Sequence, residues 1–281
     1  MTDTLINSSR PTPAGSRTIA PADSPTDGHP IDSHTIDSHT IDSASAEDRR
    51  RAALLAGFSY LALFALGIFA NFFVREQLVD TADATATFDN VAGSVNLVRW
   101  AIVAFIAAFA LDVVVAWALH LLFRPAGRAL SALTAWFRIV YTVFLGVAVV
   151  FLYTVLQLVD GPDYVSALGR PTLEANTMLA LDAFNATWLI GLVAFGIHLA
   201  LLGTMILRSG LAGRVLGVLL LVAGSAYVFD TGVYTLFDGY RDHAGLFTAI
   251  VAVPAVVAEA AFTVWLLARA GGRGLEPATA D

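Results

Sequence analysis

Six apolar stretches dominate this sequence, and each is long enough to cross a lipid bilayer. They cover residues 52–74, 97–123, 129–158, 186–207, 215–237 and 244–268. A helix needs about 20 apolar residues to span the roughly 30 Å of hydrocarbon in a bilayer. Because hydrocarbon offers no water to the backbone, every polar backbone group must be satisfied within its own span, which a helix achieves. The sequence therefore predicts an all-α fold, a polytopic bundle of six transmembrane helices with the lipid bilayer as its main partner.

The ends of the chain differ from this core. Residues 1–48 are polar and contain a short repeat, IDSHT, that begins at Ile31 and again at Ile36. Such a segment buries too little apolar surface to offset the entropy of ordering, so we predict a disordered tail. It also lacks the apolar core of a secretory signal peptide. The transmembrane domain is then expected over residues 49–270, with a short C-terminal tail over 271–281.

The residue types that are missing exclude several kinds of chemistry. Cysteine and lysine are both absent, so disulfides, thiolate ligands, Schiff bases and a P-loop lysine are excluded. The sequence contains no HExxH, GxSxG or Walker A motif, and Ser59, Ser94 and Ser131 have no histidine close to them in the chain. No basic stripe indicates nucleic-acid binding. We predict no cofactor, no metal site and no nucleic-acid partner, and an enzyme is the less favoured class.

Arginine indicates how the chain is oriented. Nine arginines flank one side of the six spans and three flank the other, where ten acidic residues also lie. Loops rich in basic residues stay in the cytoplasm, so both termini are predicted to be cytoplasmic. All 16 basic residues are arginine, a usage that we interpret as that of a GC-rich bacterial genome. The predicted location is the bacterial inner membrane. Residues 172–184, on the other side, are expected to form a separate amphipathic helix at the membrane surface.

Four ionisable residues lie at a common depth inside the spans. Each is between 9 and 11 residues from the arginine-rich end of its span, or roughly 14–17 Å at the helical rise. These residues form a predicted intramembrane polar layer: Asp112, Arg138, His198 and Glu259. A charge at a helix centre costs roughly 2.5–3.5 kcal/mol, so such groups normally face the bundle interior and find partners.

Arg138 is the expected partner of Asp112, because the two residues lie on consecutive spans at nearly the same depth. Glu259 lies at that depth too, and one arginine facing two carboxylates would leave one acid protonated. Such an arrangement suits a proton-linked transporter, and it also suits a purely structural charge lock; both interpretations stay open. Pro254 precedes Glu259 within the same span and predicts a kink there. For His198 we expect a carboxylate partner.

A second, outer polar layer is predicted nearer the other side of the membrane. It consists of Arg99, Tyr227, Asp230 and Tyr234, the last three spaced along one helix face. It could line a polar pocket or form an interfacial aromatic belt. Gly213, Gly217 and Gly224 form a stripe of small residues that begins just before the span 215–237 and continues into it. We interpret this stripe as a site of close helix packing.

The core resembles a known family of bacterial multi-pass membrane proteins. Four stretches carry the resemblance: RRAALLAGFSYLALFALGIFA, ALDVVVAWALHLLFRPAGRALSALTAWFRIV, GLVAFGIHLALLGTMILRSGLAGRVLGVLLLVAGSAYVFD and VPAVVAEAAFTVWLL. They are similar to the family catalogued as domain of unknown function 4386 in order, spacing and number of spans, over about residues 50–270. The resemblance implies an integral membrane protein, and it transfers no activity and no catalytic residues.

Two classes of function remain open from the sequence. One is small-molecule or lipid handling through the intramembrane polar layer. The other is a non-catalytic scaffold or sensor subunit, with a protein partner, whose buried charges only lock the helices together. Access of water or ligand to Arg138 and Glu259 would distinguish them, because a scaffold needs no such access.

Overall fold

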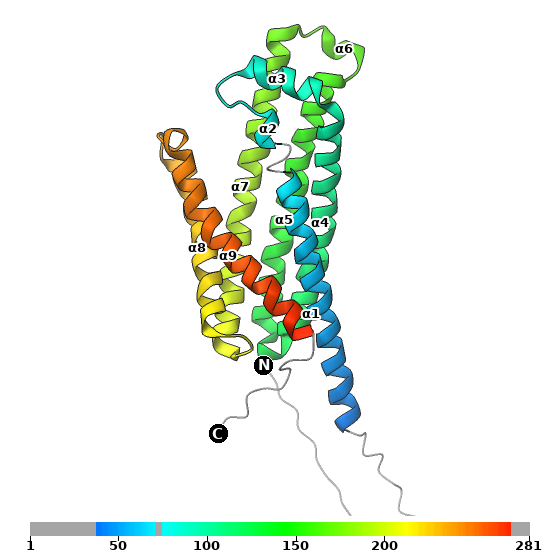
Figure 1. The fold of residues 1–281 in the computed structure, drawn as a ribbon, viewed down its shortest axis with the longest axis vertical. Helices are drawn as coiled ribbons and strands as arrows, with labels where there is room; N and C mark the ends of the chain where they lie inside the picture. Colours follow the sequence, from blue (N-terminus) through cyan, green and yellow to red (C-terminus); the bar gives the residue numbers. More distant parts are fainter. Residues whose placement is uncertain (1–37, 71–74, 271–281) are drawn as a thin grey trace, which may run out of the picture.

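Six long helices build the molecule, as the sequence predicts. The computed structural model describes residues 38–70 and 75–270, and within these ranges it contains no strand. Each long helix includes a segment apolar and long enough to cross a membrane. They are α1 (Ser38–Ile68), α4 (Val95–Phe123), α5 (Arg128–Asp160), α7 (Arg170–Ser209), α8 (Arg214–Leu236) and α9 (Ala244–Ala270). Helices α4, α5 and α7 run side by side along the long axis of an elongated bundle, and α9 crosses it obliquely (Figure 1).

Short elements connect the long helices at two opposite ends. At the upper end of Figure 1 lie α2 (Glu76–Leu78), α3 (Ala84–Gly93) and α6 (Asp163–Ser166). The 3-10 turn η2 (Arg124–Ala126) joins α4 to α5, and η3 (Arg241–His243) precedes α9. At the end of α7, Gly210 takes a left-handed conformation with φ of 64°, which glycine adopts without steric cost and which stops the helix.

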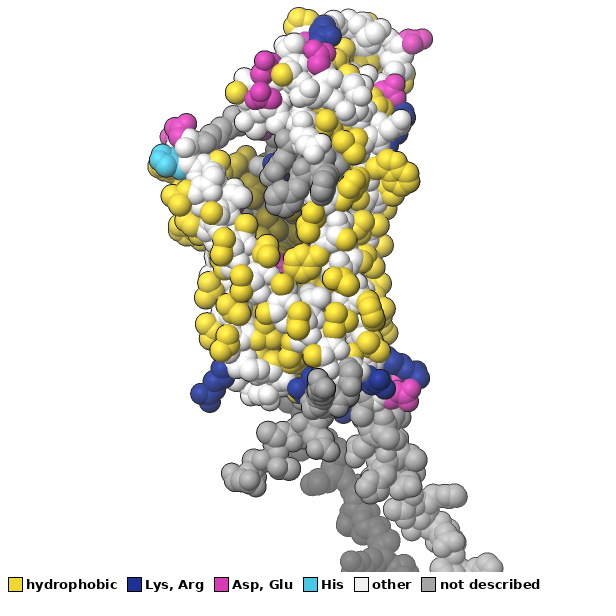
Figure 2. All heavy atoms as spheres, in the orientation of Figure 1, with side chains coloured by type: hydrophobic (Ala, Val, Ile, Leu, Met, Phe, Trp, Pro, Cys, Tyr) yellow, Lys and Arg dark blue, Asp and Glu magenta, His cyan; other side chains and the backbone are white. Residues whose placement is uncertain are grey.

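The outer surface suits a lipid environment. Large apolar side chains point outward from several helices, including Trp100 and Trp136, which are each 64% exposed. Figure 2 shows hydrophobic side chains over the middle of the molecule, with arginines gathered at its lower end. This lower end is called the arginine-rich end below, and the opposite one the acid-rich end. A surface this apolar is rare on a soluble monomer and is expected for a multi-pass membrane protein.

Helix α1 begins earlier than the sequence analysis predicts. Residues 38–48 were expected to belong to the disordered tail, but they are helical and continue directly into the first span. Arg51 pairs with Glu47 one turn before it at 2.5 Å, and such a pair supports the last exposed helical turn before the span. The predicted tails over residues 1–37 and 271–281 lie outside the described residues, as do the last residues of the first predicted span, 71–74.

The prediction of a separate surface helix over residues 172–184 is wrong. This segment is the beginning of α7, which runs without interruption from Arg170, with Pro171 in its first turn. Phe184 is 1% exposed and packs against Phe105 of α4 with ring centroids 5.3 Å apart. Tertiary packing therefore holds the segment upright. At about 1.5 Å per residue α7 is about 60 Å long, so it extends well beyond the hydrocarbon region.

Helices α7 and α8 approach each other very closely. A Cβ atom at Gly196 would lie 2.5 Å from the carbonyl oxygen of Gly224, and one at Gly203 would lie 2.5 Å from that of Gly217. The interpretation of Gly217 and Gly224 as packing residues is thus confirmed. For Gly213 it is wrong, because a Cβ there would meet no atom within 4 Å; this residue precedes α8 and lies outside the contact.

Candidate functional site

A buried ion pair joins α4 and α5 at the centre of the bundle. The Nε atom of Arg138 donates to Oδ1 of Asp112 at 2.9 Å, and its Nη2 atom donates to the same oxygen. The exposed fractions are only 1% for Arg138 and 3% for Asp112. The short connection between α4 and α5 brings the two residues to one depth, as their positions in the sequence predict. An arginine this deeply buried requires such a counter-ion.

Two further side chains complete the surroundings of the guanidinium group. Nη1 of Arg138 donates to the hydroxyl of Tyr60 at 2.5 Å, and it lies 3.3 Å from Nε2 of His198. The Tyr60 ring also faces the guanidinium, with 4.7 Å between Cζ and the ring centroid, a favourable cation–π distance. Tyr60 is not among the predicted site residues. It lies eight residues after Ala52, so counting depth for tyrosines as well as charges would have found it.

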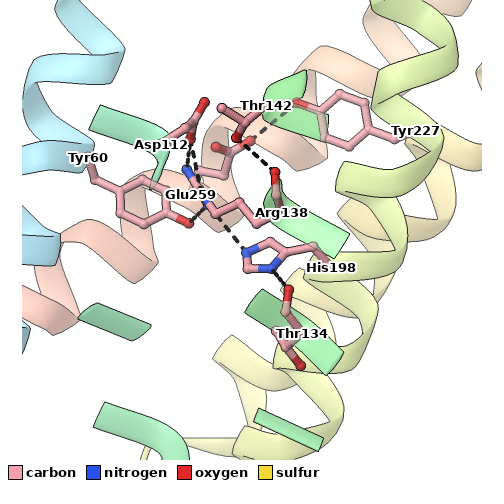
Figure 3. A network of polar contacts seen from close by, with 8 residues as sticks. All are labelled: Tyr60, Asp112, Thr134, Arg138, Thr142, His198, Tyr227 and Glu259. Carbon is pink, nitrogen blue, oxygen red and sulfur yellow. Dashed lines mark hydrogen bonds and ion pairs between the residues drawn. The ribbon is translucent and has the colours of Figure 1, made fainter. Parts of the chain in front are cut away.

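His198 takes a different partner from the one expected. Its Nδ1 atom lies 2.8 Å from the backbone carbonyl oxygen of Thr134 in α5. A carbonyl can only accept and a guanidinium can only donate, so Nδ1 carries the proton and Nε2 accepts from Arg138. The expected carboxylate partner is therefore wrong, because Asp112 lies on the other side of the guanidinium (Figure 3). His198 instead ties α7 to α5.

Glu259 stands beside this cluster with a single partner. The hydroxyl of Tyr227 donates to Oε1 of Glu259 at 3.2 Å, and Glu259 forms no ion pair with Arg138 in the described part of the chain. Both Glu259 and Tyr227 are half-buried, unlike the fully buried Arg138. Figure 3 shows the Tyr227–Glu259 contact at the edge of the network. The polar layer thus has two parts, a sealed cluster around Arg138 and a less enclosed carboxylate.

The structure rearranges the predicted outer layer. Tyr227 belongs to the inner network, because its hydroxyl reaches Glu259 across the packing of α8 on α9. Arg99 instead pairs with Asp160 at 2.7 Å on an exposed surface. Asp230 accepts a hydrogen bond from Tyr240 at 2.9 Å, and the Tyr234 and Tyr240 rings lie 5.1 Å apart. These are separate local contacts, so the four residues do not form one site.

Glu259 lies where α1 and α9 separate. On the arginine-rich side of it these helices pack closely, with 5.6 Å between the Tyr60 and Phe262 ring centroids. Glu259 is three residues before Phe262, one helical turn nearer the acid-rich end. Beyond this point α9 leans away from α1 (Figure 1), and Figure 2 shows a hollow between them, lined by hydrophobic side chains. An acidic side chain is visible in its depth (Figure 2). Pro254, the residue predicted to kink this span, lies inside α9, which stays helical through it.

A separate apolar pocket lies under α3, towards the acid-rich end. Among its lining residues are Leu78, Val91, Val98, Phe105 and Phe184. Arg75 borders it and donates to Asn185 at 2.7 Å. None of the residues of the polar layer lines this pocket, so it is distinct from the site around Arg138 and Glu259.

Neither a metal site nor a hydrolase pair is assembled by the described residues. No group of three or more His, Asp or Glu side chains in this part of the chain could hold a metal ion. The structure does bring Ser131 within 3.0 Å of Nδ1 of His120, which its sequence separation did not suggest. However, the Ser131 hydroxyl donates to the backbone carbonyl of His120, so Nδ1 must donate to Ser131. A histidine that donates to the serine is not acting as its general base.

The comparisons with known proteins identify the family of this chain and assign it no activity. The chain is 30% identical over 168 residues to a protein from Archaeoglobus fulgidus described as an uncharacterized protein, covering 60% of this chain and 82% of the relative. This relative is archaeal, so the bacterial origin stays a prediction. No solved structure matches the chain. A family model matches residues 55–270, which include all of the polar network. This chain therefore belongs to the family described as Domain of unknown function (DUF4386).

Proposed function

We propose that this multi-pass membrane protein binds a small molecule or lipid at Glu259, in the hollow between α1 and α9. The observation that carries the proposal is the half-buried carboxylate of Glu259, which has one hydrogen bond and no ion pair among the described residues. An ionisable group inside a membrane is costly and marks a functional site by default. In this structure Glu259 lies one helical turn beyond the Tyr60–Phe262 contact, where α9 leans away from α1 (Figure 1).

The alternative function is a scaffold or sensor subunit whose charges only lock helix packing. The cluster of Arg138, Asp112, Tyr60 and His198 supports that alternative, because its members satisfy one another and connect α1, α4, α5 and α7. A structural role in helix packing is enough to explain why Arg138 is buried. It does not account for Glu259, which could be replaced by an apolar residue without leaving a buried charge unpaired. We therefore favour ligand binding.

We also propose that the arginine-rich end faces the cytoplasm of a bacterial inner membrane. The beginning of α1 and the end of α9 both lie at this end (Figure 1). The arginines that flank the other long helices at this end are Arg124, Arg128, Arg208 and Arg214. The positive-inside rule supports this orientation. On it, the hollow opens from the outer half of the membrane, and Glu259 lies at its inner limit.

Cysteine labelling tests whether Glu259 is accessible. The chain has no cysteine of its own, so single-cysteine variants give an unambiguous signal. A Glu259→Cys variant should react with a small, uncharged methanethiosulfonate reagent, which can enter an apolar hollow. Ala258→Cys is the matched control, because Ala258 is the adjacent residue and is 0% exposed. Ala260→Cys is the lipid-facing control, since Ala260 is exposed on the apolar surface and a thiol in lipid does not ionise. Labelling of Glu259→Cys no faster than of these controls would reject the proposal.

A further inference from the structure

We infer that the ligand of this site is a lipophilic organic cation, with its charged group at Glu259 and its apolar body in the hollow between α1 and α9. This inference rests on the proposed function and adds the chemical class of the ligand. Three features of the structure carry it: the charge balance of the network, the apolar character of the hollow, and the aromatic hydroxyl beside the carboxylate.

The charge balance leaves one carboxylate without a counter-ion. Arg138 is neutralised by Asp112, with both bonding nitrogens on one carboxylate oxygen. His198 accepts from Arg138 through Nε2 and is therefore neutral in this arrangement. Tyr60 and Tyr227 carry no charge as phenols. Without a ligand, one arginine beside two carboxylates leaves Glu259 protonated and the network neutral. When Glu259 ionises, the network becomes negative by one charge, and a bound cation would cancel it. A bound anion would add a second negative charge in a region of low dielectric.

The hollow is apolar, so the rest of the ligand must be apolar too. On the acid-rich side of Glu259, Val256 precedes it by about one turn on the same side of α9 and is 55% exposed. Figure 2 shows hydrophobic side chains along both walls. A small hydrated ion would lose its water here without compensation. An ion whose charge is covered by hydrocarbon or aromatic groups has little hydration to lose.

Tyr227 gives the site a means to bind the charged group closely. Its hydroxyl holds Oε1 of Glu259 at 3.2 Å, and its ring packs edge-on against Phe195 with centroids 5.5 Å apart. A tyrosine ring attracts cations within about 6 Å of its face. The Arg138 guanidinium already uses the Phe195 and Tyr60 rings in this way, at 5.3 and 4.7 Å. The half-buried Tyr227 ring and the Glu259 carboxylate are therefore the groups that would meet a cation at this end of the hollow.

Two ions of the same shape and opposite charge test the inference. Tetraphenylphosphonium and tetraphenylborate would be offered to the full chain in nanodiscs of neutral lipid, and bound probe measured by equilibrium dialysis with empty nanodiscs as background. Tetraphenylphosphonium should bind the wild-type protein, and Glu259→Gln should weaken it by at least about tenfold, the effect of about 1.4 kcal/mol. Asp230→Asn is the matched control, since it removes another carboxylate of the spans that has its own partner, Tyr240. Its binding should equal that of the wild type.

A second measurement uses the unmodified protein, in case Glu259→Gln fails to fold. Dicyclohexylcarbodiimide reacts with carboxyl groups in apolar surroundings, and the modified Glu259 peptide can be quantified by mass spectrometry. Tetraphenylphosphonium should suppress this modification, and tetraphenylborate should not. Binding unchanged by Glu259→Gln, equal binding of both ions, or modification unaffected by the cation would each overturn the inference. If Glu259→Cys is nevertheless accessible to the thiol reagent, the proposed function stands with a ligand of another class.

Discussion

Arg138 directs two of its nitrogens, Nε and Nη2, to a single carboxylate oxygen of Asp112. This leaves Nη1 to bind Tyr60 and His198 on the opposite side, so one side chain connects four helices. Each of these helices must be rotated so that its polar residue points at Arg138. The arginine therefore selects which helix faces meet, which a purely apolar interface within a bilayer specifies poorly.

Replacing Arg138 should destabilise the bundle strongly. Arg138→Leu leaves Asp112 as a buried charge without a partner, and breaking such a pair costs about 3–5 kcal/mol. The double variant Asp112→Leu/Arg138→Leu should recover part of this loss, because no charge is then stranded. Thermal unfolding in detergent, followed by circular dichroism, measures both. Arg99→Leu is the control, since its pair with Asp160 is about half exposed and worth about 1 kcal/mol or less. Equal effects of Arg138→Leu and Arg99→Leu would contradict the assignment of Arg138 as the central lock.

Two substitutions of His198 should separate the contributions of its two ring nitrogens to stability. His198→Phe removes both hydrogen bonds, so that Nη1 of Arg138 loses one of its two buried acceptors, at a cost of about 1–3 kcal/mol for the two bonds. His198→Asn keeps a side-chain donor near the Nδ1 position and should be the milder change. Chemical denaturation in a mild detergent gives the comparison. His243→Ala, at an exposed residue, should leave the free energy of unfolding unchanged. An asparagine variant as unstable as the phenylalanine variant would show that the Thr134 contact contributes little.

The close approach of α7 and α8 predicts that alanine substitutions at two glycines will differ in their effect on stability. Gly196→Ala places a methyl group 2.5 Å from the carbonyl oxygen of Gly224, so the helices must move apart. Overpacking of this kind costs about 1–3 kcal/mol. Gly213→Ala meets no atom within 4 Å and its φ of −60° suits any residue, so it should be nearly neutral. Thermal stability of the two purified variants decides between these outcomes, and similar melting temperatures would mean that the α7–α8 contact is looser than described.

Reporter fusions should show that successive connections between the spans lie on opposite sides of the membrane. Fusions after residues 126 and 211 follow arginine-rich connections and should be active as cytoplasmic reporters. Fusions after residues 85, 165 and 240 should be active only as exported reporters, because nine arginines flank one side of the spans and three the other. Alkaline phosphatase and green fluorescent protein provide the two readouts. Cytoplasmic activity of the fusion after residue 165 would contradict the proposed orientation.

The sequence by itself determined which segments cross the membrane and how deep their charges lie. Both follow from local quantities: the length of an apolar run sets a span, and a fixed rise per residue sets depth along it. For this reason the depth of Asp112 and Arg138 was enough to predict their contact. Depth also identified His198 and Glu259 as neighbours of the pair, although their roles in binding remain predictions.

Only the tertiary structure decided which faces of the helices meet. The rotation of a helix about its axis depends on its neighbours, and in hydrocarbon no contrast between wet and dry faces reveals it in the sequence. For this reason the spacing of the sequence groups Tyr227 with Asp230, whereas in the structure Tyr227 binds Glu259 on α9. Likewise, His198 binds a backbone carbonyl and not the expected carboxylate. The same limit applies to α7, where packing of Phe184 on Phe105 keeps residues 172–184 in line with the span. The hollow beside Glu259 exists because α1 and α9 diverge beyond Tyr60 and Phe262, a consequence of how whole helices pack.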